Sequence, residues 1–201
     1  MTKLHRIYLI AVVVLVTIPS TAQTAYFPTH AFDTDARLNK FVNNWYSGQL
    51  RALHEPSLLT QSKIPSTQSY RFLWLRTFHH PIAVHLEVKA DGTGILTTKI
   101  ASGAGGYAPG HLMTNTSKPL TKQQTESFLH KIDADKFWEL PPVLSKEQQG
   151  DDGSQWIIEG VKGGKYHLVT QWSPTKGPIH DLGTALAFEL AGLQIPKAEV
   201  Y

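Results

Sequence analysis

The sequence has 201 residues and no cysteine among them. Disulfide bonds, thiol catalysis and zinc sites built on thiolates are therefore excluded. Lipid attachment to a cysteine behind the N-terminal apolar run is excluded for the same reason. The fold must be held together by its own core, since no covalent cross-link can stabilise it.

Long apolar runs are also missing. The N-terminus begins with Lys3 and Arg6, and 12 mainly apolar residues (7–18) follow before a small-residue pattern. A helix needs about 20 apolar residues to cross the bilayer core, whereas this layout is typical of a secretory signal peptide. We expect residues 1–22 to be removed after Ala22, which gives a periplasmic or secreted protein without membrane contact. An uncleaved anchor is the less favoured alternative.

A strong charge imbalance is missing as well. Without Lys3 and Arg6, 17 basic residues face 16 acidic residues, and nine histidines remain. A nearly neutral chain with no Lys/Arg run and no recognisable nucleic-acid motif argues against a nucleic-acid partner. The remaining chain, residues 23–201, is long enough for one domain with one sizeable core.

Helical periodicity marks three segments of the sequence. Apolar residues recur at helical spacing from residue 34 to residue 54. A second helix is expected to begin at Thr121, which can form a capping box with Gln124. A closing helix is expected from Pro178, which suits a first helical turn. Residues 56–69 are rich in Ser, Thr and Pro and predict a surface connection.

Five strands are expected in addition. Residues 70–78 are apolar on both faces, which is typical of a central strand. A second strand near residues 84–89 returns through an Asp-Gly-Thr-Gly turn into a third strand at 95–100. Residues 154–172 predict a further hairpin around Gly163-Gly164.

The predicted fold is α+β. We expect a mainly antiparallel sheet of about five strands in two hairpin-containing units, packed with about three helices. Residues 23–69 would form the N-terminal helix and linker, and residues 70–201 the sheet with its helices. One globular domain would span about residues 30–201.

The segment 102–110 combines four glycines with a proline and predicts a loop. It lacks the Gly-Lys-Ser/Thr end of a phosphate loop and the spacing of a dinucleotide fingerprint. A loop that caps or crosses the sheet is therefore favoured over a nucleotide site. Gly-x-Ser-x-Gly and His-Glu-x-x-His motifs are also missing from the sequence.

The second hairpin carries the strongest candidate chemistry. A three-residue loop at 162–164 would gather the apolar residues on one face and place Glu159 directly opposite His167. We therefore predict this register. His167 would then be a general base oriented by Glu159, with Asp151 and Asp152 at the strand entrance. The alternative is a cross-strand pair that only stabilises the sheet.

Two arginines, Arg71 and Arg76, lie in the most apolar strand. A buried arginine needs carboxylate or carbonyl partners, so at least one of the two should be paired. Arg76 shares a face with several aromatic residues and is expected to be the more buried one, with Glu87, Glu159 or Asp152 as its partner. An ion pair that positions the sheet is favoured over recognition of an anionic ligand, although both remain open.

Three histidines, His79, His80 and His85, are close together in the sequence and form a weak candidate for a metal site. His111 or His167 could supply a third convergent ligand. Pro81 interrupts the strand between them, so edge or turn positions are the favoured interpretation.

These observations favour an exported, non-enzymatic domain that binds a small ligand, a peptide or another envelope protein. One sheet face or the Gly-rich loop would form the contact surface. The alternative is an acid/base hydrolase that uses His167 and Glu159, and a weaker one is metal binding by histidines. No cofactor is expected.

Overall fold

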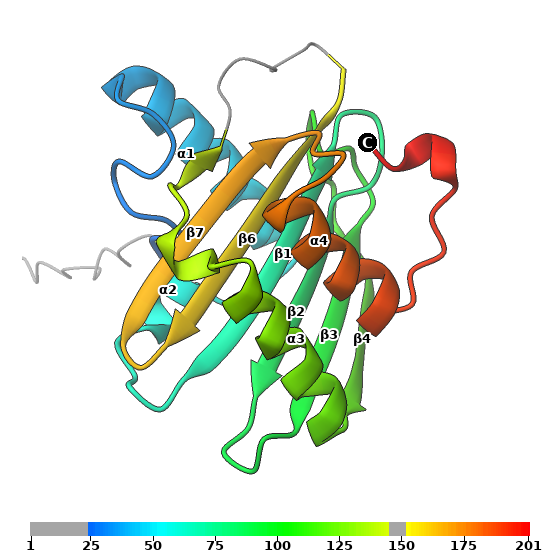
Figure 1. Cartoon of the computed structure of the whole chain (residues 1–201). Helices are drawn as coiled ribbons and strands as arrows, with labels where there is room; N and C mark the ends of the chain where they lie inside the picture. Colours follow the sequence, from blue (N-terminus) through cyan, green and yellow to red (C-terminus); the bar gives the residue numbers. More distant parts are fainter. Residues whose placement is uncertain (1–23, 145–151) are drawn as a thin grey trace, which may run out of the picture.

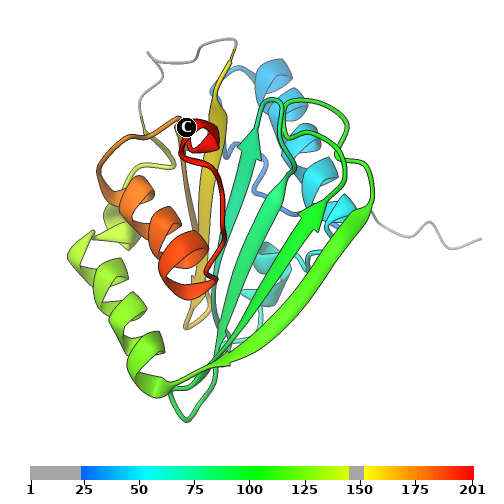
Figure 2. The same cartoon turned by 90° about the vertical axis from the view of Figure 1, so that its right-hand side faces the viewer.

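The computed structural model describes residues 24–144 and 152–201. A single seven-stranded sheet forms the middle layer, and helices cover both of its faces (Figures 1 and 2). The strands are β1 (Gln68–Arg76), β2 (Ile82–Val88), β3 (Gly94–Ala101), β4 (Leu112–Leu120), β5 (Val143–Leu144), β6 (Ser154–Lys162) and β7 (Lys165–Trp172). Their order across the sheet is β4-β3-β2-β1-β6-β7-β5. All neighbours are antiparallel except β5 and β7, which are parallel.

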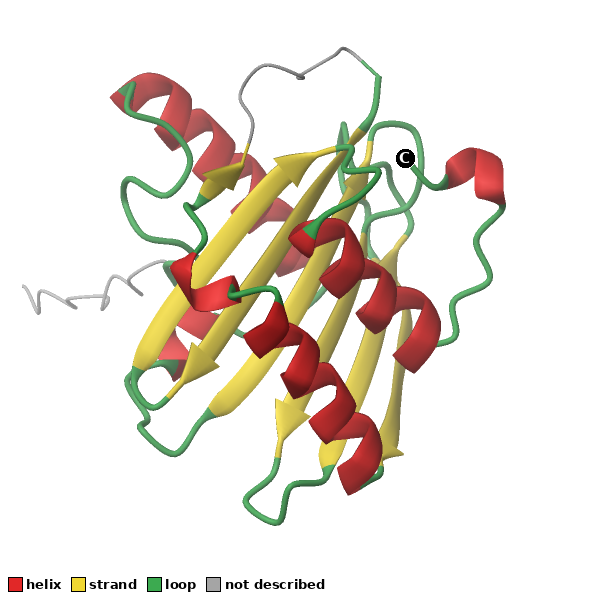
Figure 3. Cartoon of the chain, viewed as in Figure 1, coloured by secondary structure: helices red, strands yellow, loops and turns green. Residues whose placement is uncertain are grey.

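The helices divide between the two faces of the sheet (Figure 3). The α-helices are α1 (Ala36–Ala52), α2 (Leu58–Gln61), α3 (Lys122–Ala134) and α4 (Pro178–Thr184). A π-helical segment, η2 (Ala185–Leu190), continues α4, and the 3-10 turns are η1 (Phe137–Glu139) and η3 (Lys197–Glu199). Helices α3 and α4 lie on one face, and α1 lies on the other (Figure 2).

The predicted α+β class with a mainly antiparallel sheet is confirmed, but its details are wrong. Residues 24–144 and 152–201 contain seven strands and four α-helices, in place of the expected five and three. Strand β4 was missed because its middle residues, 114–118, are all polar and the strand is mostly solvent-exposed, as suits a sheet edge. Strand β5 has only two residues and leaves no periodic signal. The central strand predicted at residues 70–78 is present as β1, the fourth of seven, but it begins and ends two residues earlier, at Gln68 and Arg76.

The ends of the helices follow the sequence closely. The Asp35 side chain accepts hydrogen bonds from two backbone N–H groups at the start of α1. The predicted capping box of Thr121 and Gln124 is present at the start of α3. Pro178 begins α4 behind Gly177, whose φ of 92° favours glycine.

Helix α1 ends in a backbone motif that places Glu55 in the interior of the protein. The Glu55 N–H donates to the Leu50 carbonyl at 2.9 Å, and the His54 N–H donates to that of Arg51 at 3.0 Å. His54 adopts a φ of 51° between them. This is the Schellman arrangement, which reverses the chain directly after a helix. It leaves Glu55, which is buried, at the start of the connection to α2.

The sheet has an apolar core on each face. Tyr70, Phe72 and Trp74 of β1 pack with α3 and α4, together with Trp156 of β6. On the other face, the core contains apolar residues of β1, β6 and α1 and of the segment before α1. Burial of one large apolar side chain contributes about 1.5–3 kcal/mol, so these two layers are the main source of stability.

Two predictions concern residues outside this description. The expected signal peptide, residues 1–22, and the candidate residue Asp151 both lie outside the described residues. Among residues 24–144 and 152–201, no helix has the length and apolar character needed to span a bilayer.

The predicted register of the β6–β7 hairpin is wrong by one residue. Glu159 pairs with Leu168, and His167 pairs with Gly160. Gly163 and Gly164 alone form the turn, with φ values of 59° and 79°, as a two-residue turn with positive φ at both central positions requires. The amphipathicity argument failed because helices cover both faces of the sheet, so both faces of the hairpin carry apolar residues.

Candidate functional site

The observed register separates the predicted catalytic pair. Glu159 faces the α1 side of the sheet, beside Arg71, whereas His167 faces the α3 side and contacts the ring of Phe137. Residues on opposite faces of a sheet cannot form a general base and its orienting carboxylate. The predicted role of His167 and Glu159 as one acid/base unit is therefore wrong.

A buried ionic network replaces this pair on the α1 side. It consists of charged and polar side chains from β1, β2, β3, β6 and β7 and from the segment after α1. Its members are Glu55, Ser69, Arg71, His85, Lys99, Glu159 and Tyr166. Register brings Glu159, Arg71 and His85 into one row across the sheet.

Arg71 is at the centre of the network. Its Nε and Nη2 atoms donate to Glu159 Oε2 at 2.8 and 2.5 Å, and its Nη1 atom donates to Glu55 Oε2 at 3.2 Å. Nη1 also donates to the Pro56 carbonyl at 2.7 Å. The Tyr166 hydroxyl donates to the other oxygen of Glu159 at 2.9 Å. These contacts satisfy the buried charge with several donors and acceptors, as burial requires.

The buried position of the network changes several pKa values. Burial raises the pKa of Glu55, but the hydrogen bond from His85 and the charges of Arg71 and Lys99 outweigh it, so the net pKa is well below the ordinary value. Burial lowers the pKa of Arg71, and the two carboxylates more than compensate. Burial and the Glu159 charge raise the pKa of Tyr166 well above 10.0. Glu55 and Arg71 are therefore charged and Tyr166 is neutral at pH 7.

Ser69, His85 and Glu55 form a hydrogen-bonded chain of the kind used in nucleophilic catalysis. Ser69 Oγ lies 2.6 Å from His85 Nε2, and His85 Nδ1 lies 3.0 Å from Glu55 Oε2. The geometry meets the first criterion for a catalytic triad. However, the three residues are only 1%, 3% and 4% exposed, and Ser69 Oγ also contacts the Leu86 carbonyl at 3.1 Å. A substrate cannot reach the Ser69 hydroxyl. These three hydrogen-bonded residues therefore stabilise the buried side of the sheet.

Arg76 is buried, but the prediction that it is the more buried arginine is wrong, because Arg71 is 0% exposed and Arg76 3%. Its partner also differs from the predicted ones. Its Nη1 atom lies 3.1 Å from Glu199 Oε2 in the C-terminal segment, and its guanidinium carbon lies 4.7 Å from the centre of the Trp74 ring. Burial lowers the pKa of Arg76 despite the Glu199 charge. The predicted partners Glu87, Glu159 and Asp152 are therefore wrong for Arg76, while Glu159 binds the other arginine, Arg71.

The candidate metal ligands point to separate partners. His79 contacts the Tyr201 hydroxyl at 2.8 Å, and His80 contacts the Gly103 carbonyl at 2.9 Å. His85 belongs to the buried network. In the part of the chain that the structure describes, no three His, Cys, Asp or Glu side chains are arranged to hold a metal ion.

The Gly-rich segment 102–110 is an irregular loop, as predicted, and it packs on the end of β1. The backbone N–H groups of Gly105 and Gly106 donate to carbonyls of residues 79 and 77. A Cβ atom on Gly105 would lie 2.6 Å from the Leu75 backbone, so this close approach requires glycine. Exposed rings of Phe78 and Tyr107 lie side by side there, 6.2 Å apart.

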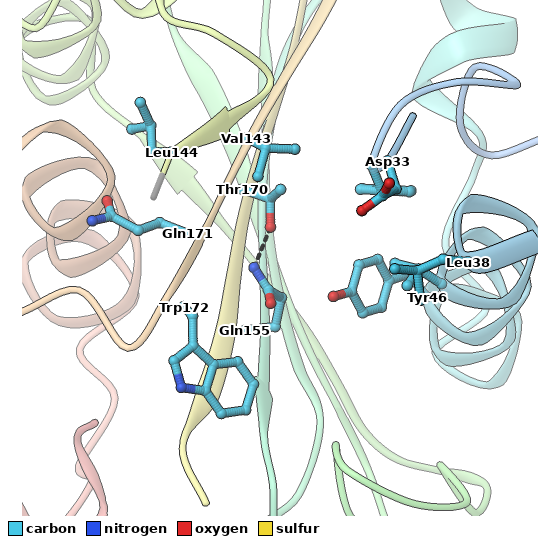
Figure 4. A pocket seen from close by; sticks show the side chains of 11 residues that line it. Asp33, Leu38, Tyr46, Val143, Leu144, Gln155, Thr170, Gln171 and Trp172 are labelled. Carbon is cyan, nitrogen blue, oxygen red and sulfur yellow. Dashed lines mark hydrogen bonds between the residues drawn. The ribbon is translucent and has the colours of Figure 1, made fainter. Parts of the chain in front are cut away.

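A small cleft opens between α1 and the β5–β7 end of the sheet (Figure 4). Its volume is about 70 Å³. Leu38, Val42 and Tyr46 line it from α1, while Thr170 and Trp172 line it from β7. The cleft therefore brings a helix face and a sheet end together.

The cleft combines polar and apolar walls. The side-chain amide of Gln155 donates to the Thr170 hydroxyl, and the Tyr46 hydroxyl points toward this pair (Figure 4). Within the described residues the Tyr46 hydroxyl has no hydrogen-bond partner, and burial raises its pKa, so it stays protonated. It can donate to or accept from a group that enters the cleft.

Most of the buried ionic network could not be predicted from the sequence. Lys99, Ser69 and Glu55 belong to no sequence motif, and they have a role only because the fold places them beside buried charges. The one available signal was the arginine in an apolar strand, which required a carboxylate partner.

The sequence matches no model of a known protein family, and no significantly similar curated protein was found. The function must therefore be inferred from the geometry of the cleft and its surroundings.

Proposed function

We propose that this chain is an exported, non-enzymatic binding domain that holds a short peptide segment of another exported protein. One side chain of that segment would enter the cleft between α1 and the β5–β7 end of the sheet. Export is inferred from the layout of residues 1–22, which resembles a signal peptide.

The size of the cleft supports a side chain as the occupant. A single water molecule needs about 10–15 Å³ of such space, whereas whole small-molecule ligands occupy clefts of about 300–1,000 Å³. A volume of about 70 Å³ lies between these values. It suits a group of a few heavy atoms that is attached to a larger molecule.

The rim of the cleft supports a protein partner. Leu38, which lines the cleft, is 49% exposed, and Phe41, one turn further along α1 and outside the lining, is 64% exposed. Exposed apolar side chains around a recessed hollow are typical of interaction surfaces, where an anchor side chain is surrounded by apolar contacts. The observation that carries the proposal is this rim together with the free Tyr46 hydroxyl at the base of the cleft, which lacks a partner among the described residues.

The proposal can be tested with peptides selected from a random displayed library against the secreted form of the chain. Affinities are then measured by fluorescence anisotropy for the wild type, Val42→Phe, which fills the cleft, and Phe41→Ser, which removes the rim contact. We expect each variant to weaken binding by about tenfold or more. Tyr46→Phe should weaken only peptides with a polar anchor.

Phe78→Ser is the matched control, because Phe78 is 57% exposed but lies beside the Gly-rich loop and not at the cleft. Thermal unfolding of each variant verifies that the fold is retained. Selected peptides that bind Val42→Phe and Phe41→Ser as tightly as the wild type, or a library that yields no specific peptide, would show the proposal to be wrong.

A further inference from the structure

A second hollow lies at the opposite end of the β6–β7 hairpin. Its volume is about 560 Å³, and its walls are Trp138, Tyr166, His167 and the turn residues Lys162, Gly163 and Lys165. Lys165 and Trp172 of the cleft lie at the two ends of β7, seven residue steps apart. At about 3.3 Å per residue this is a separation of about 23 Å, so the two sites are independent.

The charges at this hollow are unusual for a hairpin. Lys162 and Lys165 pair directly across the two-residue turn. Like charges at directly opposite positions destabilise a sheet. In residues 24–144 and 152–201 neither lysine forms an ion pair with a carboxylate. Glu139, the neighbour of Trp138 in η1, does not line the hollow.

The walls of the hollow add an aromatic surface. The rings of Trp138 and His167 lie 6.1 Å apart at an angle of 35°. The His167 ring packs edge-on against Phe137 and interacts with the backbone of Phe137 and Leu140, which fixes its position in the wall. Two cations and a broad indole ring therefore border one space.

We infer that this hollow binds a small organic anion, with its carboxylate or phosphate group between Lys162 and Lys165 and its flat apolar part against Trp138. The two ammonium groups supply the charge that the anion needs. The ring face supplies apolar contact area for the uncharged part of the ligand. The bound anion would also relieve the repulsion between the two lysines.

Phenyl phosphate is a suitable probe, followed by the indole signal of Trp138 in ¹H–¹⁵N NMR spectra and by calorimetry. We expect saturable binding that weakens as salt is added. Lys162→Gln and Lys165→Gln should each reduce the affinity by about five- to tenfold. Both lysines are exposed, so neither substitution should disturb the fold. Lys89→Gln, at an exposed lysine of the β2–β3 turn, is the matched control and should leave the affinity unchanged.

Three comparison ligands sharpen the test. Benzoate should bind, because it carries the same ring with a carboxylate. Benzamide should bind at least tenfold more weakly, because it lacks the charge, and inorganic phosphate should bind more weakly because it lacks the ring. The inference is overturned if phenyl phosphate gives no saturable shift at Trp138, if benzamide or inorganic phosphate binds equally well, or if both lysine variants bind like the wild type.

Discussion

The guanidinium of Arg71 and the carboxylate of Glu159 form an ion pair in which neither side chain is exposed to solvent. Register makes them direct cross-strand neighbours on β1 and β6, at the centre of the sheet. Glu55 adds a second carboxylate from the end of α1. The pair therefore links the two hairpin-containing units of the sheet to each other and to the helix layer.

Removal of Arg71 should destabilise the protein strongly. Arg71→Ala leaves Glu159 without a cation, while Glu55 keeps Lys99 and His85 as partners. Removal of one partner of a buried pair costs about 3–5 kcal/mol, because the other charge is left uncompensated. Urea unfolding at pH 7 measures the change in the free energy of unfolding.

The double variant Arg71→Met/Glu159→Leu provides the control. It removes both charges of the pair and fills the space with apolar atoms, which often restores much of the lost stability. We expect it to be more stable than Arg71→Ala. A double variant that is less stable than the single one would contradict the view that uncompensated charge is the main cost.

Tyr166 should contribute through its hydroxyl alone. Tyr166→Phe keeps the ring but leaves Oε1 of Glu159 without its hydrogen bond. An unsatisfied buried acceptor costs about 1–3 kcal/mol, which chemical denaturation at pH 7 can detect. Equal stability of Tyr166→Phe and the wild type would show that another group satisfies this oxygen.

The stabilities of the wild type and of Tyr166→Phe should depend differently on alkaline pH. The folded-state pKa of Tyr166 lies well above its ordinary value of 10.0. The stability that the neutral hydroxyl contributes is therefore present below pH 10 and is lost as the pH rises above it. We expect the stability gap between wild type and Tyr166→Phe to narrow between pH 9 and about pH 11.5. A gap that widens over this interval would reverse the assigned direction of the shift.

Acid should act through Glu55 with the opposite sign. Its folded-state pKa is below its ordinary value of 4.5, so its contribution is present above pH 4.5 and is lost as the pH falls below that value. Carboxyl ¹³C NMR should show Glu55 still ionised at about pH 3, where exposed glutamates are protonated. A Glu55 signal that titrates near 4.5 would refute this arrangement of charges.

The sequence predicted the parts of the fold that depend on local signals. The helical spacing of α1, the capping box of α3, Pro178 at the start of α4, and the doubly apolar strand β1 each carry their own pattern. Strand β4 carries no such pattern, because its middle residues, 114–118, are all polar and only the pairing with β3 makes it a strand.

The candidate site was harder to predict because its residues meet through tertiary structure. A charged residue in an apolar strand indicates that a partner exists but not which one. Glu159 was correctly considered as the partner of an arginine. However, a shift of one residue in a strand's register moves a side chain to the other face of the sheet, where it meets different partners. The choice between Arg71 and Arg76 therefore depended on how β6 pairs with β1, which no local pattern reveals.

Substitutions in the β6–β7 turn test the register in which β6 pairs with β7. Gly163 and Gly164 both have positive φ, so Gly164→Val should destabilise the hairpin by about 1–2 kcal/mol, because side chains with a branched Cβ are strained in this region. Gly163→Asn should change the stability little, because Asn-Gly is a favoured sequence for this turn. A three-residue loop from 162 to 164 would pair Glu159 with His167 instead. NMR contacts between the backbones of residues 160 and 167 distinguish the two, and contacts between 159 and 167 in their place would establish the alternative register.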